Sequence, residues 1–182
     1  MLTLVAIMAA AVMLVAAGSA AEAAKQPAAG TPASQAGYLV KVNCGGPAAD
    51  GLLADQAYTA GSWGHVGGTP STADTVAGEA NYPTGMKSCR SSVGTFEYRF
   101  DVPRGVYNVK LHFAEPSFNQ PGDRRFNVSI NGVPKLINYD VYTDAGDRNK
   151  AVRKVFNGSA VVGGQLVVRL GAISGTTGGA LV

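Results

Sequence analysis

The chain has 182 residues, of which 24 are glycine, and only 15% of its residues are charged. This composition favours a single β domain with many tight turns over a helical bundle. The net charge is only +3, and the basic residues form no run or stripe, which argues against a nucleic-acid-binding protein.

The first 23 residues have the pattern of a targeting segment. Residues 2–17 are apolar apart from Thr3, and small residues follow them. This order is typical of a signal peptide, with Ala21-Glu22-Ala23 as the predicted cleavage site. The alternative is an uncleaved anchor that tethers the protein to a membrane, although a spanning helix needs roughly 20 apolar residues. We therefore expect a secreted, extracellular protein.

A linker is predicted to connect this segment to the folded domain. Residues 24–37 are rich in Pro, Ala and Gly and contain no large apolar side chain. Such a segment has nothing to bury that would offset the entropy lost on ordering. The folded domain is accordingly assigned to residues 38–182.

The two cysteines of an exported chain predict a disulfide. Cys44 and Cys89 form an even pair, and in an oxidising compartment such a pair is expected to be bridged. Closing a loop of about 46 residues contributes about 4 kcal/mol in the chain-entropy model. The alternative is two buried free thiols. Two lone cysteines and two histidines lack the spacing of metal ligands, so we predict no metal and no cofactor.

The first part of the domain is predicted to be one strand followed by a long binding loop. Residues 38–44 alternate loosely and end at Gly45-Gly46, which indicates a strand and a turn. Residues 50–94 are rich in Gly, Ser, Thr, Ala and Pro and include Tyr58, Trp63 and Tyr82. A long irregular segment inside a compact domain is often a binding loop.

The β pattern is strongest after Gly94. Strands are expected at residues 95–102, 106–115, 125–130, 135–137, 152–162, 165–170 and 180–182. Asn131-Gly132, between two apolar runs, predicts a tight hairpin that buries Phe126, Val128 and Ile130. No stretch has sustained helical periodicity. The fold class predicted from these features is all-β, a jelly-roll-like antiparallel β-sandwich.

Five stretches in succession resemble the malectin domain family. They are VNCGG at 42–46, DQAYTAGSWG at 55–64, FEYRFDVP at 96–103, GVYNVKLHFAE at 105–115 and RFNVSING at 125–132. The resemblance covers residues 38–182 and implies a galactose-binding-like sandwich. It further implies that aromatic residues on loops at one end bind glucose-containing oligosaccharides. Flat aromatic faces and a few polar groups suffice for such a site.

The resemblance places the sugar site on particular residues of this chain. The residues predicted to bind carbohydrate are Trp63, Phe118, Arg90, Asn119 and Tyr58. For Arg90 the alternative is a structural ion pair with Glu79 or Glu97, and for Trp63 the alternative is burial at the edge of the sandwich. The chain departs from the family pattern elsewhere: Met86, Ser91 and Ser117 stand where the family has aromatic residues, and Ser174 or Gly175 stands at its acidic position. We expect the Tyr58–Trp63 loop, the Arg90 region and residues 118–122 to meet at one rim.

The predicted function is non-catalytic binding of a glucose-containing oligosaccharide or polysaccharide. The alternative is a domain that binds a protein or peptide, or serves as a structural ectodomain, with a degraded sugar site. Glu115 and Asp140 are the candidate acid and base of a glycoside hydrolase, and no second motif supports this role. Asp140, Asp144 and Asp147 are expected to cap turns rather than to bind Ca²⁺.

Overall fold

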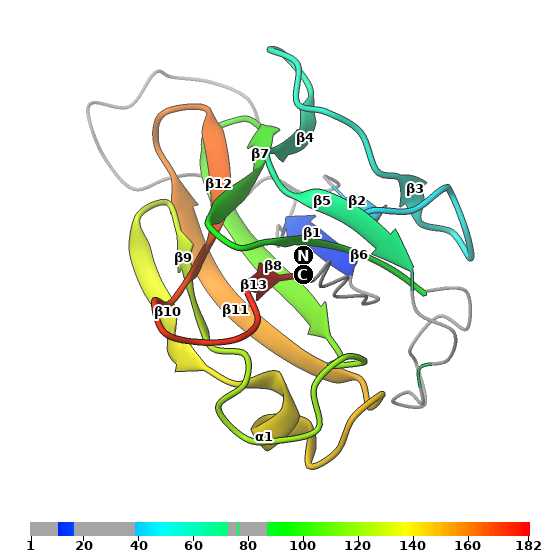
Figure 1. The fold of residues 1–182 in the computed structure, drawn as a ribbon. Coiled ribbons are helices and arrows are strands. Elements are labelled where there is room, and N and C mark those ends of the chain that lie inside the picture. The colour runs from blue at the N-terminus through cyan, green and yellow to red at the C-terminus, as the bar shows by residue number, and fades with distance from the viewer. Residues whose placement is uncertain (1–10, 17–38, 73–75, 77–86) are drawn as a thin grey trace, which may run out of the picture.

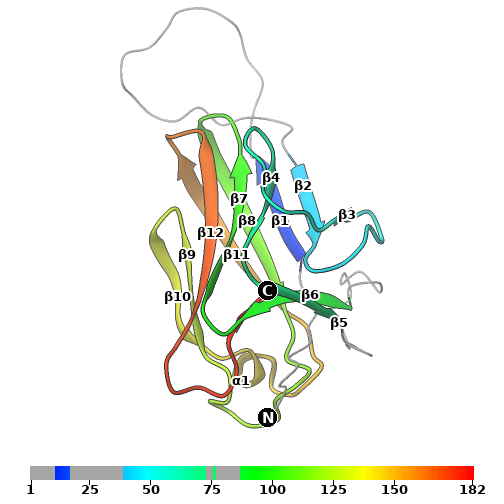
Figure 2. The same cartoon turned by 45° about the horizontal axis from the view of Figure 1, so that its top comes forward.

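The computed structural model describes residues 11–16, 39–72, 76 and 87–182. Within these residues the chain is an all-β domain of three sheets, as Figures 1 and 2 show. The predicted all-β sandwich is therefore confirmed. The predicted linker at 24–37, together with Tyr82 and Met86, lies outside the described residues.

Two five-stranded sheets form the layers of the sandwich. The first has the order β11 (Val152–Val161), β8 (Gly105–Phe113), β1 (Ala11–Ala16), β2 (Leu39–Asn43) and β3 (Leu53–Ala54). The second has the order β10 (Val133–Tyr139), β9 (Phe126–Ile130), β12 (Gln165–Ala172), β7 (Thr95–Asp101) and β4 (Trp63–Val66). Neighbouring strands are antiparallel except for β2 and β3, which run parallel.

A small third sheet lies beside the sandwich and closes one side of it. Its order is β13 (Ala180–Leu181), β6 (Ser88–Ser92) and β5 (Thr69–Thr72). The described helix, α1 (Val141–Ala145), has one turn and begins at Asp140, whose side chain accepts a hydrogen bond from Thr143 N. The predicted capping role of Asp140 is confirmed.

Alternating side chains of β7, β8, β9 and β12 build the core between the two large sheets. In β8, Tyr107, Val109, Leu111 and Phe113 are fully buried, and the residues between them are less so until the strand ends. Phe113 packs against Phe126 of the opposite sheet, with 5.8 Å between ring centroids. This inward–outward alternation is what the period of a half-buried strand requires.

The hairpin predicted at Asn131-Gly132 is present. Both residues have positive φ, 49° and 78°, as a two-residue turn of this kind needs. Phe126, Val128 and Ile130 are buried, so the predicted register is confirmed.

Residues 50–94 are more regular than the sequence indicated. They contain β3, β4, β5 and β6, all of which the prediction of a long binding loop missed. These strands are short, and their sequences LA, WGHV, TPST and SCRSS lack the alternating apolar side chains that mark the longer strands. Among the described helices, none has the length and apolar character needed to cross a membrane.

The predicted disulfide is not formed. Cys44 and Cys89 are not joined by a disulfide, and both are fully buried. The Sγ of Cys89 lies 3.0 Å from the Oγ of Ser71, so this thiol is part of a polar contact between β5 and β6. The alternative of two buried thiols is the one that the structure supports.

Candidate ligand-binding site

A pocket of about 320 Å³ opens where the third sheet meets the loop before β13. Its lining is mostly small and hydroxyl-bearing: Thr69, Pro70, Ser71, Ser91, Ser92, Val93, Arg124, Thr177, Gly178 and Gly179. The loop is held in place by backbone contacts, because Gly178 N donates to Asp123 O at 2.7 Å and Ala180 pairs with Ser92. Segments more than 50 residues apart in the chain therefore form one concave surface.

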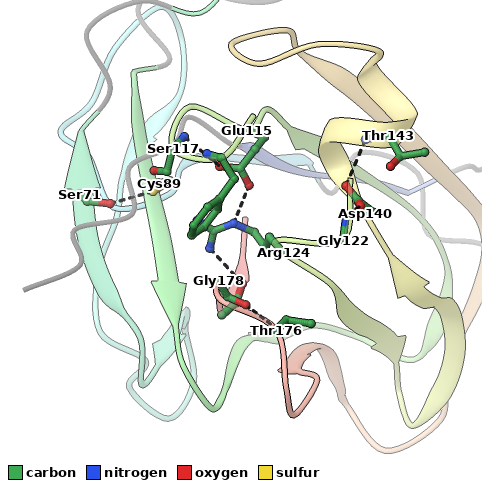
Figure 3. A network of polar contacts seen from close by, with 12 residues as sticks. Ser71, Cys89, Glu115, Ser117, Gly122, Arg124, Asp140, Thr143, Thr176 and Gly178 are labelled. Carbon is green, nitrogen blue, oxygen red and sulfur yellow. Dashed lines mark hydrogen bonds and ion pairs between the residues drawn. The ribbon is translucent and has the colours of Figure 1, made fainter. Parts of the chain in front are cut away.

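Arg124 forms the base of this pocket and is fixed by a buried ion pair. Its Nε donates to Oε2 of Glu115 at 2.6 Å, and the two side chains are only 2% and 1% exposed. Its Nη1 donates to the carbonyl of Gly179 at 3.0 Å. Figure 3 shows the guanidinium between Glu115 and the loop before β13. Its Nη2 has no hydrogen-bond partner among the described residues.

Glu115 also holds the turn that carries Phe118. Its Oε1 accepts from the backbone N–H groups of Ser117, at 2.9 Å, and Phe118, at 3.1 Å. One carboxylate thus links the end of β8, the buried Arg124 and the position of the aromatic ring. Charge-assisted hydrogen bonds of this kind are stronger than neutral ones and fix geometry well.

Phe118 lies next to the pocket and packs on two residues that line it. The Arg124 guanidinium lies 4.9 Å from the centroid of its ring, within the range of a cation–π contact. A Cβ atom at Gly178 would lie 2.5 Å from the ring, so the close approach requires glycine there. The ring is half-buried, and the neighbouring Asn119 is exposed.

The pocket also offers polar groups that the protein does not use itself. The side-chain hydroxyls of Ser91 and Thr177 have no hydrogen-bond partner in the described part of the chain. In contrast, Ser92 Oγ accepts from Gly94 N, and Ser71 Oγ contacts the Cys89 thiol. A ligand hydroxyl entering the pocket would find two uncommitted donors on a rigid base.

Arg90 directly precedes Ser91, which lines the pocket, but the Arg90 side chain points away from the pocket. It is 5% exposed, its Nε donates to Asp55 Oδ2 at 2.9 Å, and its Nη1 donates to Gly68 O at 2.7 Å. These bonds join β6 to the segments before β4 and after it. The guanidinium is used within the fold, so these contacts favour the structural alternative for Arg90, with Asp55 as its partner instead of Glu79 or Glu97.

Trp63 and Tyr58 lie at the other end of the sandwich. The Trp63 ring stacks on Phe100 with 6.3 Å between centroids and 16° between planes. Tyr58 Oη donates to Asp101 at 2.8 Å and accepts from Gln165 at 3.0 Å. The hydrogen bond to Asp101, with some burial, raises the pKa of Tyr58, and the bonds from Gln165 and Tyr58 lower the pKa of Asp101.

The predicted residues therefore do not meet at one rim. Tyr58 contacts Gln165, the first residue of β12, whereas Phe118 contacts Gly178, beyond the last residue of that strand. A strand of this length spans roughly 25 Å. Figure 2 shows the same separation, with β4 near one end of the sandwich and the segment that precedes β9 near the other. Phe118 and Asn119 remain beside the pocket, and Trp63 and Tyr58 do not.

Comparison with known proteins identifies the family. A family model described as the malectin domain matches residues 38–178. The chain belongs to the malectin domain family. The predicted resemblance is thus confirmed over most of the domain.

Relatives of this malectin domain occur as parts of larger proteins. An Arabidopsis thaliana protein named "Probable LRR receptor-like serine/threonine-protein kinase" is 35% identical over 107 residues, which are 55% of this chain and 10% of the kinase. The structure is similar to Bacteroides uniformis beta-glucuronidase (TM-score 0.62, 29% identity), covering 78% of this chain and 17% of the enzyme. It is also similar to the ANX1 ectodomain of Arabidopsis thaliana (TM-score 0.58, 16% identity, 79% and 45% covered), a likeness of fold.

Sequence reasoning missed the residues that shape the pocket of this malectin domain. Arg124, Thr177 and Gly178 were not singled out, because nothing local in the sequence marks a buried ion pair or a close glycine–ring contact. The sequence does carry one signal of the buried ion pair. Glu115 follows closely after the apolar strand β8, and a carboxylate that is buried there needs a charged or hydrogen-bonding partner.

The candidate catalytic carboxylates have structural partners. Glu115 is bound to Arg124, and Asp140 accepts from Thr143 N and from Gly122 N. Asp144 accepts from Tyr139 Oη and pairs with Lys154. Within the part of the chain that the structure describes, no group of three or more His, Cys, Asp or Glu side chains is placed to hold a metal ion.

Proposed function

We propose that this malectin domain is an exported, non-catalytic module that binds carbohydrate in the pocket between Ser91, Thr177 and Arg124. The observation that carries the proposal is the combination of uncommitted hydroxyls with a base fixed by the Arg124–Glu115 ion pair. Phe118 supplies an apolar ring beside these donors. Sugar sites use this combination of a few oriented polar groups and an aromatic face.

The ligand class is a glucose-containing oligosaccharide or polysaccharide, as the family resemblance implies. One partly exposed aromatic ring and a few hydrogen bonds that compete with water give modest affinity. A dissociation constant on the order of 0.1–1 mM corresponds to about 4–5.5 kcal/mol. Asn119, exposed next to Phe118, is a further candidate for hydroxyl contacts.

Absence of catalysis is part of the proposal and has structural support. Glu115 is buried in an ion pair, and Asp140 caps α1 and accepts from Gly122 N. Neither carboxylate is placed as one of two groups facing a common cleft, which glycoside hydrolysis requires. Export of the protein is inferred from the targeting segment at residues 1–23.

A glycan array on the full chain, followed by calorimetry on the best binder, tests the proposal. Ser91→Ala and Thr177→Val should each weaken binding about five-fold, because each removes one hydrogen bond worth about 1 kcal/mol. Thr59→Val is the matched control, since Thr59 is exposed in the Tyr58–Trp63 loop at the other end of the domain. Equal loss in all three variants, or in none, would place the sugar elsewhere.

A peptide ligand is the second candidate, and the rim of the same pocket favours it. Val93 is 93% exposed and lines the pocket together with Pro70, so the rim is partly apolar. An empty glycan array, combined with peptide binding that Val93→Ser weakens, would select this alternative. Retention of sugar binding in Val93→Ser would count against it.

A further inference from the structure

A second pocket, of about 500 Å³, lies at the end of the sandwich away from Phe118 and is lined in part by Gln165, the first residue of β12. The turn between β9 and β10 and the connection from β11 to β12 lie at this end (Figure 2). β10 and β11 are edge strands of the two large sheets, and both contribute to the lining, so the pocket lies in the open side of the sandwich between them. Its volume is within the range of sites that hold small organic ligands.

Asn131 fixes the lining of this pocket. Its Nδ2 donates to Ala160 O on β11 at 2.8 Å, and its Oδ1 accepts from Val167 N on β12 at 2.8 Å. β11 belongs to the first sheet and β12 to the second, so this side chain joins the two sheets. Gln165 is committed as well, because its Nε2 donates to Asp101 Oδ1 at 2.7 Å. The pocket is therefore formed before a ligand enters.

A bulge in β11 places a hydroxyl on the inner face of that strand, at the pocket. The register of β11 with β8 shifts between Phe156 and Ser159, and Gly158 within the shift has a φ of 73°. After the shift, Ser159 and Val161 take the buried positions. Ser159 is 5% exposed and lines the pocket, and its Oγ has no hydrogen-bond partner in the described part of the chain. A buried hydroxyl without a partner is costly, which favours a ligand atom as the missing partner.

β10 brings a cation to the same pocket. Val133 and Lys135 both line it, whereas Pro134 between them lines a different pocket, as the alternation along a strand requires. Lys135 is half-buried, and its ammonium group forms no hydrogen bond or ion pair with any other residue that the structure describes. None of the described residues in the lining is acidic. A partly desolvated ammonium without a counter-charge attracts an anion more strongly than one in bulk water.

Apolar side chains provide much of the remaining surface of this pocket. Val133 and Val162 both line it and are 54% and 67% exposed. Ile130 lines it as well, from a buried position. A short apolar chain of a ligand would cover the two valines and gain the free energy of removing that surface from water.

The charges in the lining determine which acidic group fits. One ammonium and one hydroxyl match a group with a single negative charge, because each can form one charge-assisted hydrogen bond to it. A phosphate carries more charge and is usually held by arginine or by a row of backbone N–H groups at a helix N-terminus. The described lining contains no arginine and no helical residue.

We propose that this pocket is a second ligand site, which binds a small carboxylic acid with a short apolar chain. The carboxylate accepts from the Lys135 ammonium and from the Ser159 hydroxyl. The chain packs against Val133 and Val162. The site is separate from the pocket at Arg124 and does not depend on sugar binding there.

NMR titration of the ¹⁵N-labelled full chain with hexanoate tests this inference. We expect saturable shifts of the Gly158 and Gly163 amides and of the Asn131 side-chain amide. A dissociation constant on the order of 1 mM is reasonable for a ligand of about eight non-hydrogen atoms. Hexanamide, which lacks the charge, and glucuronate, which lacks the apolar chain, should each bind at least about five-fold more weakly than hexanoate. Salt at about 0.5 M should weaken the binding of hexanoate more than that of hexanamide.

Two variants and a matched control test the assigned residues. Lys135→Gln should weaken hexanoate binding about five-fold or more and leave hexanamide binding unchanged. Lys150→Gln is the control, because Lys150 is exposed and precedes the opposite end of β11. Ser159→Ala should weaken binding several-fold, and the Tm of the ligand-free protein should stay the same or rise, since the variant removes an unpaired buried hydroxyl.

Four outcomes contradict the inference. Equal affinity for hexanoate and hexanamide, or equal hexanoate affinity in the wild type and Lys135→Gln, would exclude a carboxylate site. Shifts that do not saturate and are spread over other lysines would show only non-specific attraction of an anion. Tighter binding of glucuronate than of hexanoate would replace the small acid with an acidic sugar. A lower Tm of ligand-free Ser159→Ala would show that this hydroxyl serves the fold and not a ligand.

Discussion

Arg124 and Glu115 form an ion pair inside the sandwich, with 2.6 Å between Nε and Oε2 and almost no exposed surface on either side chain. The same carboxylate accepts from the backbone N–H groups of Ser117 and Phe118. Its energetic role differs from that of a surface pair. Taking both charges out of water is costly, and removing one partner leaves the other buried and unpaired.

Glu115→Ala is therefore expected to destabilise the domain by about 3–5 kcal/mol, the usual cost of breaking a buried pair. Urea denaturation at neutral pH measures this free energy. Replacing both residues, Glu115→Leu with Arg124→Leu, should cost less than the Glu115→Ala change alone, because no charge remains buried. A double variant that is less stable than Glu115→Ala would contradict this account.

Gly178→Ala is expected to weaken ligand binding more than it weakens the fold. The new Cβ would meet the Phe118 ring at 2.5 Å, so the ring must move away from its place beside the pocket. Gly163→Ala is the control, since its Cβ meets nothing within 4 Å. Calorimetry with the ligand found on the array should show at least a several-fold loss for Gly178→Ala and none for the control. Unchanged affinity in both variants would remove Phe118 from the site.

The fold was predictable where burial alternates along one strand. Phe96, Tyr98 and Phe100 of β7 are buried and the residues between them are not, so the pattern is visible within seven residues. The turn at Asn131-Gly132 was equally visible, because few other residue pairs accept two positive φ values.

The site was not predictable in the same way, because its contacts join distant residues. Arg90 binds Asp55, 35 residues away, and Arg124 reaches Gly179, 55 residues away. An arginine in an alternating sequence gives no indication of whether it faces solvent or a buried carboxylate. The family pattern located Phe118 beside the pocket, but it also suggested a shared rim with Trp63 that the topology of β12 rules out.

Trp63→Ala is expected to destabilise the fold while leaving ligand binding intact. The ring stacks on Phe100 and packs against the core, and half-buried aromatic residues contribute roughly 2 kcal/mol by comparison with fully buried ones. Thermal denaturation and the same calorimetric titration measure the two properties. Trp63→Phe should recover most of the lost stability. Loss of binding with unchanged stability would instead return Trp63 to the ligand site.

Labelling of thiols tests whether the two cysteines lack a disulfide between them. Cys44 and Cys89 are both fully buried, so the native protein should react slowly with a thiol reagent. The denatured, non-reduced protein should react at two positions. Mass spectrometry counts the labels, and a protein that takes none after denaturation would contain the bridge that the structure lacks.

Stability is expected to fall as the pH is lowered from about 7 to about 4, largely because of His112. Burial, with the positive charges of Arg153 and Lys110, lowers the pKa of this histidine from 6.5 to about 4. Between these two values the unfolded state binds more protons than the folded state, so stability decreases as the pH falls. The slope of the unfolding free energy against pH reaches about 1.4 kcal/mol per pH unit and vanishes above the pKa that His112 has in the unfolded chain.

Burial and the charge of Arg90 lower the pKa of His65 as well, which adds an effect of the same sign. Urea denaturation between pH 7.5 and 4.5 should show the decline in the wild type, a shallower one in His112→Gln, and a smaller change of slope in His65→Gln. A wild-type stability that is constant over this range, or a His112→Gln profile as steep as that of the wild type, would show that His112 is not held neutral by its burial in the fold.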